Sequence, residues 1–286
     1  MKELTKRPTE LFGYDCDEHI NSNAFKLALK QQYCKYIKNT CVKPRKSEPS
    51  VKVGICSIGA TLCTKQVRPV IICPQRFKED SMFESIRQIY LSGWQNVKWI
   101  PEVNIGVGGS IDYVAVEVDK KDNVKDFLCV ELQAAGTTGS PYPAVREIKA
   151  SGHFESTSYN YGINWANEFS KTMMQQAYKK GKILESWGRK IVFVVQDLAI
   201  EYLKSATDCS LLTGKNNELP VDFCTFKMIW MPSKNWNLVS DKIYSTSIEG
   251  VNLMLGGASI NEYLTENEFI ENIIKKGIAD GILKKQ

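Results

Sequence analysis

The chain is organised around the stretch 108-GGSIDYVAVEVDKKDNVKDFLCVELQAAGTTGS-140. It contains two runs of strong β-forming residues, Ile111–Val118 and Phe127–Leu132. The charged segment Asp119–Asp126, rich in Lys, Asp and Asn, separates them. Two such runs joined by a polar turn predict a β-hairpin.

Two carboxylates and an amide lie at one end of this predicted hairpin. Side chains alternate across a strand, so Phe127–Leu132 is apolar on both faces, as in a strand inside a covered sheet. An unpaired carboxylate there costs several kcal/mol, so Glu131 needs a cation, a proton or water. Because the first residues of one hairpin strand lie beside the last residues of the other, we expect Asp112, Glu131 and Gln133 to converge.

Such a group of oxygen ligands suits Mg²⁺, which prefers carboxylates and retains several bound waters. The ion polarises a phosphoryl oxygen and lowers the pKa of a bound water, which is the chemistry of a phosphodiesterase. The competing interpretation is structural. In that case Asp112 caps a turn and Glu131 is a buried acid paired with a lysine.

The sequence around the hairpin predicts an α/β fold in which a mixed sheet is flanked by helices. Helical periodicity and apolar runs alternate along the chain, and Pro143–Tyr161, with small polar residues, is expected to be a loop. The expected elements are a helix at Ser81–Leu91, a strand at Asn96–Ile105, a helix at Asn164–Gly181 capped by its glycine, strands at Lys190–Ile200 and Asp222–Met231, and a helix at Thr265–Leu283.

Glu102, in the strand predicted before the hairpin, is a candidate third acid near the metal. The alternative is a surface glutamate.

The N-terminal part of the chain differs in composition from the rest. Six of the nine cysteines, and more than the whole net charge of +5, fall within residues 1–75. A basic module suits an anionic polymer such as nucleic acid, although solvated lysines explain the charge equally well. Clustered cysteines in a reducing compartment indicate a metal or buried packing, and no pair here has the C-x₂-C spacing of a zinc ribbon.

The hairpin resembles the active site of the PD-(D/E)xK nuclease superfamily, with Gln133 in the place of the lysine. GSIDYV, VELQA and TTGS are similar to the NotI-type restriction endonucleases. This resemblance implies a PD-(D/E)xK core, with Asp112 and Glu131 as metal ligands and catalytic residues, together with Gln133 and Glu102. Because an amide does not replace an ammonium group, the metal must do more, or another lysine, such as Lys171, must reach the site.

The segments QYCKYIKNTC, GICSIG and IICPQRF resemble the four-cysteine, iron-binding N-terminal domain of the same family. The resemblance implies a structural site, with Cys16 or Cys63 as possible replacements for one ligand. By geometry alone, four thiolates hold Zn or Fe equally well. The implied domains are a DNA-contacting metal module at 1–75 and a catalytic domain at 76–286. The carried-over ligands are Cys34, Cys41, Cys56 and Cys73.

The resemblance implies a type II endonuclease that cuts double-stranded DNA at a short palindrome with Mg²⁺, as a homodimer. Its functional partner would be a cognate DNA methyltransferase in the same bacterial cytoplasm. No apolar run approaches the roughly 18 to 20 residues that cross a membrane, and the N-terminus has no apolar core of a signal peptide. The alternative function is a metal-stabilised, sequence-specific DNA-binding regulator whose nuclease core is inactive.

Overall fold

The computed structural model describes residues 3–45, 47–62, 66–256 and 270. Residues Met1–Leu255 form one compact unit and Gly256–Gln286 form a second. The helix predicted at Thr265–Leu283 lies outside the described residues, except for Ile270, which is helical. Every helix within the described ranges is too short or too polar to span a bilayer.

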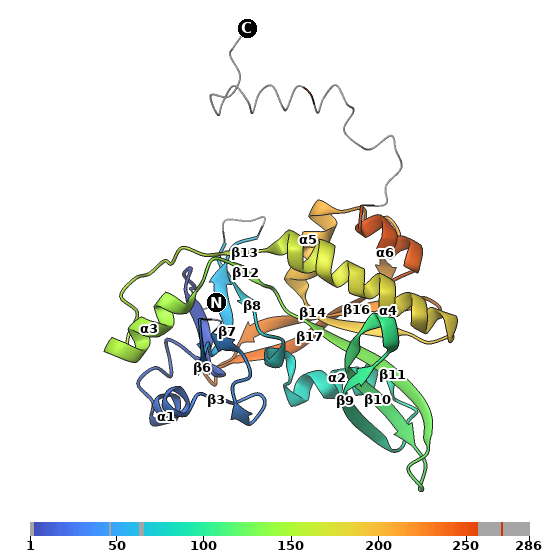
Figure 1. Ribbon diagram of the computed structural model, residues 1–286, viewed down its shortest axis with the longest axis horizontal. Helices are drawn as coiled ribbons and strands as arrows, with labels where there is room; N and C mark the ends of the chain where they lie inside the picture. Colours follow the sequence, from blue (N-terminus) through green and yellow to red (C-terminus); the bar gives the residue numbers. More distant parts are fainter. Residues whose placement is uncertain (1–2, 46, 63–65, 257–269, 271–286) are drawn as a thin grey trace. The chain divides into compact units, whose positions relative to one another are not determined.

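In the described part of the chain, seven strands form the main sheet (Figure 1). Their order is β15 (Thr213–Gly214), β17 (Trp236–Thr246), β16 (Val221–Trp230), β14 (Ile191–Gln196), β11 (Val124–Gln133), β10 (Ser110–Val118) and β9 (Val97–Asn104). β14 pairs in parallel with β11 and β16, whereas the other neighbours are antiparallel. The predicted mixed sheet of an α/β protein is therefore confirmed.

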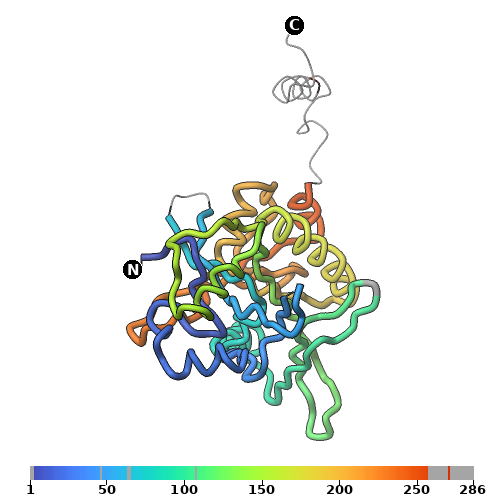
Figure 2. Tube along the Cα trace, turned by 60° about the vertical axis from the view of Figure 1, so that its left-hand side comes forward, coloured from blue at the N-terminus to red at the C-terminus, as the bar shows by residue number. Residues whose placement is uncertain are grey.

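The predicted hairpin is formed by β10 and β11, in a register that pairs Tyr113 with Val130 and Val114 with Cys129. Its turn is shorter than predicted because β11 already begins at Val124. The turn projects away from the rest of Met1–Leu255, as Figures 1 and 2 show. The opposite end of the hairpin therefore carries the predicted acids.

Helices cover both faces of the main sheet (Figure 1). On one face lies α2 (Asp80–Tyr90), and on the other lie α4 (Met174–Ser186), α5 (Asp197–Ala206) and α6 (Ile248–Met254), with a π-helical segment, η3 (Ala166–Met173), leading into α4. The helices α1 (Asn23–Gln31) and α3 (Tyr142–Ser151) lie beside the N-terminal strands instead (Figure 1). Along β11, Cys129 packs into the cluster that contains α4, α5 and α6, and Val130 packs into the cluster that contains α2. An apolar pattern on both faces thus belongs to a strand that is buried on both sides.

The N-terminal region contains a second, antiparallel sheet. Its order is β2 (Tyr14–Asp15), β1 (Pro8–Leu11), β7 (Ile55–Ala60) and β8 (Arg68–Ile71). Short two-stranded pairs join β3 (Tyr33–Cys34) to β4 (Asn39–Thr40), β5 (Pro44–Arg45) to β6 (Glu48–Lys52), and β12 (Thr137–Thr138) to β13 (Gly162–Ile163). Short 3₁₀ helices lie at η1 (Pro74–Phe77) and η2 (Gly106–Gly108). The division into domains at residue 75 stays a prediction.

Two predicted elements are wrong in their extent or type. The segment Pro143–Tyr161 was expected to be a loop, but α3 occupies its first half, because Val145 and Ile148 recur at helical spacing and are buried. The strand predicted at Lys190–Ile200 ends at Gln196, where α5 begins with an acidic residue in its first turn. An acid in that position is favourable to the helix dipole.

Gly181 lies inside α4 and does not cap it, so the predicted C-cap is also wrong. A Cβ on Gly181 would lie 2.8 Å from Cγ2 of Val221 and 2.9 Å from Cδ1 of Ile248. Glycine thus allows α4 to approach the sheet closely. As a consequence Lys180, which the sequence places in a last helical turn, is carried into the interior, where it is 4% exposed.

Candidate active site

The structure brings Asp112 and Glu131 together at the end of the hairpin. The Leu132 amide donates to Oδ2 of Asp112 at 2.8 Å. The Asp112 amide in turn donates to Oε1 of Glu131 at 3.3 Å. Each carboxylate is therefore oriented by the backbone of the strand that carries the other.

The surroundings of Glu131 disfavour its negatively charged form. Glu131 is only 5% exposed, whereas Asp112 is half-buried. Burial first, and the charge of Asp112 second, raise the pKa of Glu131 to about 7, against the opposing effect of the Lys180 ammonium group. Paired acids with a raised pKa of this kind favour the binding of a cation.

Glu131 is a buried acid paired with a lysine, as the structural interpretation expects, and the sequence did not identify that lysine as Lys180. Its Nζ donates to Oε1 of Glu131 at 2.7 Å, to the carbonyl oxygen of Ser110 at 2.8 Å and to Oε1 of Gln176 at 3.3 Å. A signal for it exists in the sequence, because position 180 continues the buried stripe of Met173 and Ala177 at helical spacing. The lysine proposed from sequence, Lys171, is exposed and does not line the cavity described next.

A cavity of about 650 Å³ lies in front of the two acids. Its wall combines the hairpin end, the Gly108–Ser110 turn and polar side chains of η3 and α4, including Thr172 and Gln176. Gln133 also lines it, with its amide donating to the carbonyl oxygen of Ala134 at 3.0 Å. The predicted convergence of Asp112, Glu131 and Gln133 is thus present in the fold, and their catalytic roles remain predictions.

Glu102 lies on β9, outside the residues that line this cavity. Its side chain is exposed and its backbone is left-handed, with φ of 54°. Its role as a third acid stays a prediction. Among the residues that the structure describes, no group of three or more His, Cys, Asp or Glu side chains is arranged to hold a metal ion.

The same finding corrects the expected four-cysteine metal module, since the described thiols do not form a metal-holding group. The four cysteines are nevertheless buried and close enough to affect one another. Burial raises the pKa values of Cys34, Cys56 and Cys73, and the other cysteines of the set, Cys41 included, raise them further.

Of the two spare cysteines, only Cys16 lies within the described residues. Burial raises the pKa of Cys16 well above its ordinary value, and the next contributions come from the charges of Asp15, Asp17 and Glu10. Cys63 lies outside the described residues.

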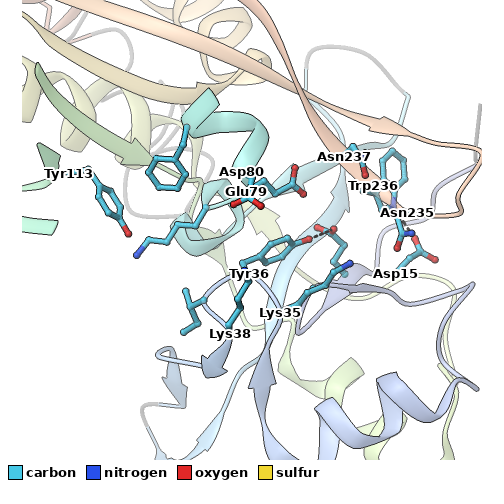
Figure 3. Close-up of a pocket in the computed structure, with 15 residues that line it drawn as sticks. Asp15, Lys35, Tyr36, Lys38, Glu79, Asp80, Tyr113, Asn235, Trp236 and Asn237 are labelled. Atoms are coloured by element: carbon cyan, nitrogen blue, oxygen red, sulfur yellow. Dashed lines mark hydrogen bonds between the residues drawn. The ribbon is translucent and has the colours of Figure 1, made fainter. Parts of the chain in front are cut away.

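A second cavity of about 650 Å³ lies between the N-terminal region and the main sheet (Figure 3). Its carboxylates already have partners: Tyr36 donates to Glu10 at 2.8 Å, and the Trp236 indole donates to Asp15 at 2.9 Å. The bond from Trp236 on β17 to Asp15 on β2 joins the main sheet to the N-terminal sheet, so we interpret this cavity as part of a structural junction.

A family model described as restriction endonuclease NotI matches residues 27–210. The match covers more than half of the chain and includes the four cysteines, the hairpin and α4. No curated protein matches the chain.

Proposed function

Because the chain belongs to the family of the restriction endonuclease NotI and is therefore a site-specific deoxyribonuclease, we propose that it hydrolyses double-stranded DNA at a short palindromic sequence with Mg²⁺. The observation that carries the proposal is the adjacency of Asp112 and Glu131 at the mouth of a cavity. Positioned carboxylates beside a space for a phosphate are what metal-assisted hydrolysis requires.

The residues at this cavity fit Mg²⁺. Asp112 and Glu131 would hold the ion, since burial first and the charge of Asp112 second raise the pKa of Glu131, and a bound cation would favour its charged form. Two protein carboxylates, with waters and phosphate oxygens completing the shell, are a usual Mg²⁺ environment. When bound, the ion polarises a phosphoryl oxygen and lowers the pKa of a water.

The chain itself supplies orientation at this site. The Leu132 amide holds one oxygen of Asp112, and the Asp112 amide holds one oxygen of Glu131. Both carboxylates are thus preorganised by backbone groups of rigid strands, which limits the reorganisation needed when substrate arrives.

We further propose that the enzyme acts as a homodimer in which each subunit cuts one strand. A palindrome has two-fold symmetry, and a two-fold symmetric protein matches it with one contact set used twice. In this proposal the enzyme works in the bacterial cytoplasm, beside a methyltransferase that protects the same sequence in the host DNA.

Incubation of plasmid DNA with the purified protein and Mg²⁺ tests the activity. We expect discrete fragments whose ends share one sequence. Plasmid that is retarded in a gel but remains intact at every Mg²⁺ concentration would instead favour a DNA-binding regulator with an inactive nuclease core. Fragments with unrelated end sequences would contradict site specificity but not nuclease activity.

A structural Fe or Zn site at Cys34, Cys41, Cys56 and Cys73 is a separate proposal. It is supported by the burial of these four thiols and by their proximity, since Cys41 acts electrostatically on Cys34 and Cys73, and Cys73 acts on Cys56. Their described arrangement nevertheless does not form a metal site. Ligation would draw them together as thiolates and would stabilise the N-terminal region.

Replacement of Cys56 by Ser tests this proposal, with Cys16→Ser as the matched control. Both thiols are buried in the N-terminal region, but only Cys56 belongs to the four. We expect elemental analysis to find Fe or Zn in the wild-type protein and in Cys16→Ser, and to find it lost in Cys56→Ser. Wild-type protein that is stable and free of both metals would contradict the site.

A further inference from the structure

We propose that Lys180, on α4, supplies the ammonium group that contacts the scissile phosphate in the candidate active site. This inference rests on the proposed function. It assigns the positive charge of the site to a helix on the far side of the cavity from the hairpin strands. Position 133 of β11, which the resemblance associates with a lysine, holds a neutral amide.

The burial of Lys180 requires an explanation. A lysine that is 4% exposed loses most of its hydration, which costs several kcal/mol unless partners replace the water. Here the partners are Glu131, the Ser110 carbonyl and Gln176, all of which line the same cavity. A lysine with no function beyond solubility is normally at the surface, so the burial of Lys180 among groups of this cavity indicates a role in the site.

The Nζ atom of Lys180 lies beside the two acids, where a scissile phosphate would bind. It lies 2.8 Å from the carbonyl oxygen of Ser110, two residues before Asp112, and 2.7 Å from Oε1 of Glu131. It therefore sits where the ends of β10 and β11 carry the two acids. Among the described residues of the cavity wall, only Lys179 and Lys180 carry positive charge, and Lys179 is exposed.

The fold holds this lysine in place. Met173, Ala177 and Leu184 anchor the same face of the helix in the core. Gly181 removes the Cβ that would otherwise keep α4 away from Val221. The ammonium group is thus positioned by close packing of a helix on a sheet, which limits its movement.

The role follows from the charge balance of hydrolysis. A water oxygen forms a bond to phosphorus and its proton passes to solvent, while the bond from phosphorus to one bridging oxygen breaks and that oxygen takes up a proton from solvent. Negative charge builds on the phosphoryl oxygens in between. Lys180 exchanges its longest hydrogen bond, at 3.3 Å to Gln176, for one to a phosphoryl oxygen and keeps its proton, which stabilises the transition state more than the ground state.

The test compares Lys180→Met with Lys182→Met, an exposed lysine on the same helix that does not line the cavity. We expect the single-turnover cleavage rate of Lys180→Met, at saturating Mg²⁺ and DNA, to fall by about 10² to 10³. Lys182→Met should stay within about threefold, because its ammonium group is solvated. DNA binding measured in Ca²⁺ should change little in either variant.

A readout independent of cleavage separates a catalytic role from a merely structural one. Lys180 competes with a metal ion for Glu131, so Mg²⁺ titration by calorimetry should find affinity in Lys180→Met equal to or greater than that of the wild type. Cleavage lost despite tighter metal binding supports the proposal. A cleavage rate that returns to the wild-type value at high Mg²⁺ would show that Lys180 is only a counter-ion, and would overturn it.

A second variant decides the matter if Lys180→Met does not fold. In Lys180→Met/Gln133→Lys the ammonium group returns to the same cavity from β11, so we expect at least about a tenfold gain over a folded Lys180→Met, or measurable cleavage where that variant is unfolded. A folded double variant that binds DNA but does not cut would overturn the proposal. If wild-type protein itself does not cut any DNA, the proposed function fails, and Lys180 is not the cause.

Discussion

Replacement of Asp112 by Asn is expected to abolish DNA cleavage. Asparagine retains an oxygen that accepts from the Leu132 amide, so the hairpin end keeps its shape while the negative charge is lost. Without that charge the site loses one of its two anionic ligands for Mg²⁺. We expect the single-turnover rate to fall by at least about 10³, which corresponds to about 4 kcal/mol of transition-state stabilisation.

Asp122→Asn is the matched control for this variant. It makes the same chemical change on the same hairpin, but at the exposed turn, where Asp122 forms a surface ion pair with Lys98. Such pairs contribute little to stability, so its rate should remain near that of the wild type. Both variants should bind specific DNA in Ca²⁺. Full cleavage by Asp112→Asn would remove the assignment of the active site.

Replacement of Arg76 by Met is expected to produce the largest loss of stability. Arg76 is fully buried and donates to Glu10 at 2.8 Å, to Glu79 and, at 2.9 Å, to the carbonyl oxygen of Trp236. It also lies over the ring of Tyr36. Burial lowers the pKa of Arg76, but the charge of Glu10 more than offsets this, so the pKa stands above its ordinary value. The guanidinium group is therefore charged in the folded protein.

Most of the lost stability comes from the buried charge of Glu10, which the substitution leaves without its ion-pair partner. Glu10 is 2% exposed, and methionine offers it no charge. Removal of one partner of a buried ion pair costs about 3 to 5 kcal/mol. Because Arg76 joins the N-terminal sheet, α2 and β17, urea unfolding should show one transition at lower urea concentration.

Arg87→Met on α2 is the control, since that arginine is exposed and its replacement should change the free energy of unfolding by less than about 0.5 kcal/mol. In the double variant Arg76→Met/Glu10→Gln, the unpaired charge of Glu10 is also removed. Part of the lost stability should then return, which a double-mutant cycle measures. A cost below about 1 kcal/mol for Arg76→Met would mean that water reaches Glu10 and that the junction is not a buried ion pair.

Much of the fold could be predicted because it depends on local periodicity. The β10–β11 hairpin, α2 and β9 follow from alternation or helical spacing among near neighbours. α3 was missed because its small polar neighbours concealed a short buried stripe. The extent of α4 was missed because a glycine near a helix end is usually a cap, whereas Gly181 is used here for close packing.

The sequence by itself determined the hairpin, and with it the adjacency of Asp112 and Glu131. Antiparallel pairing of the two strands puts both residues at the same end of the hairpin. Only the tertiary structure decided which positively charged side chain pairs with Glu131. Lys180 is 49 residues from Glu131, and its identity as the partner depends on how closely α4 packs on the sheet. The same holds for Arg76 and Glu10, 66 residues apart. Strand pairing within this hairpin is set by neighbours along the chain, whereas the pairing of these buried charges is set by packing between distant elements.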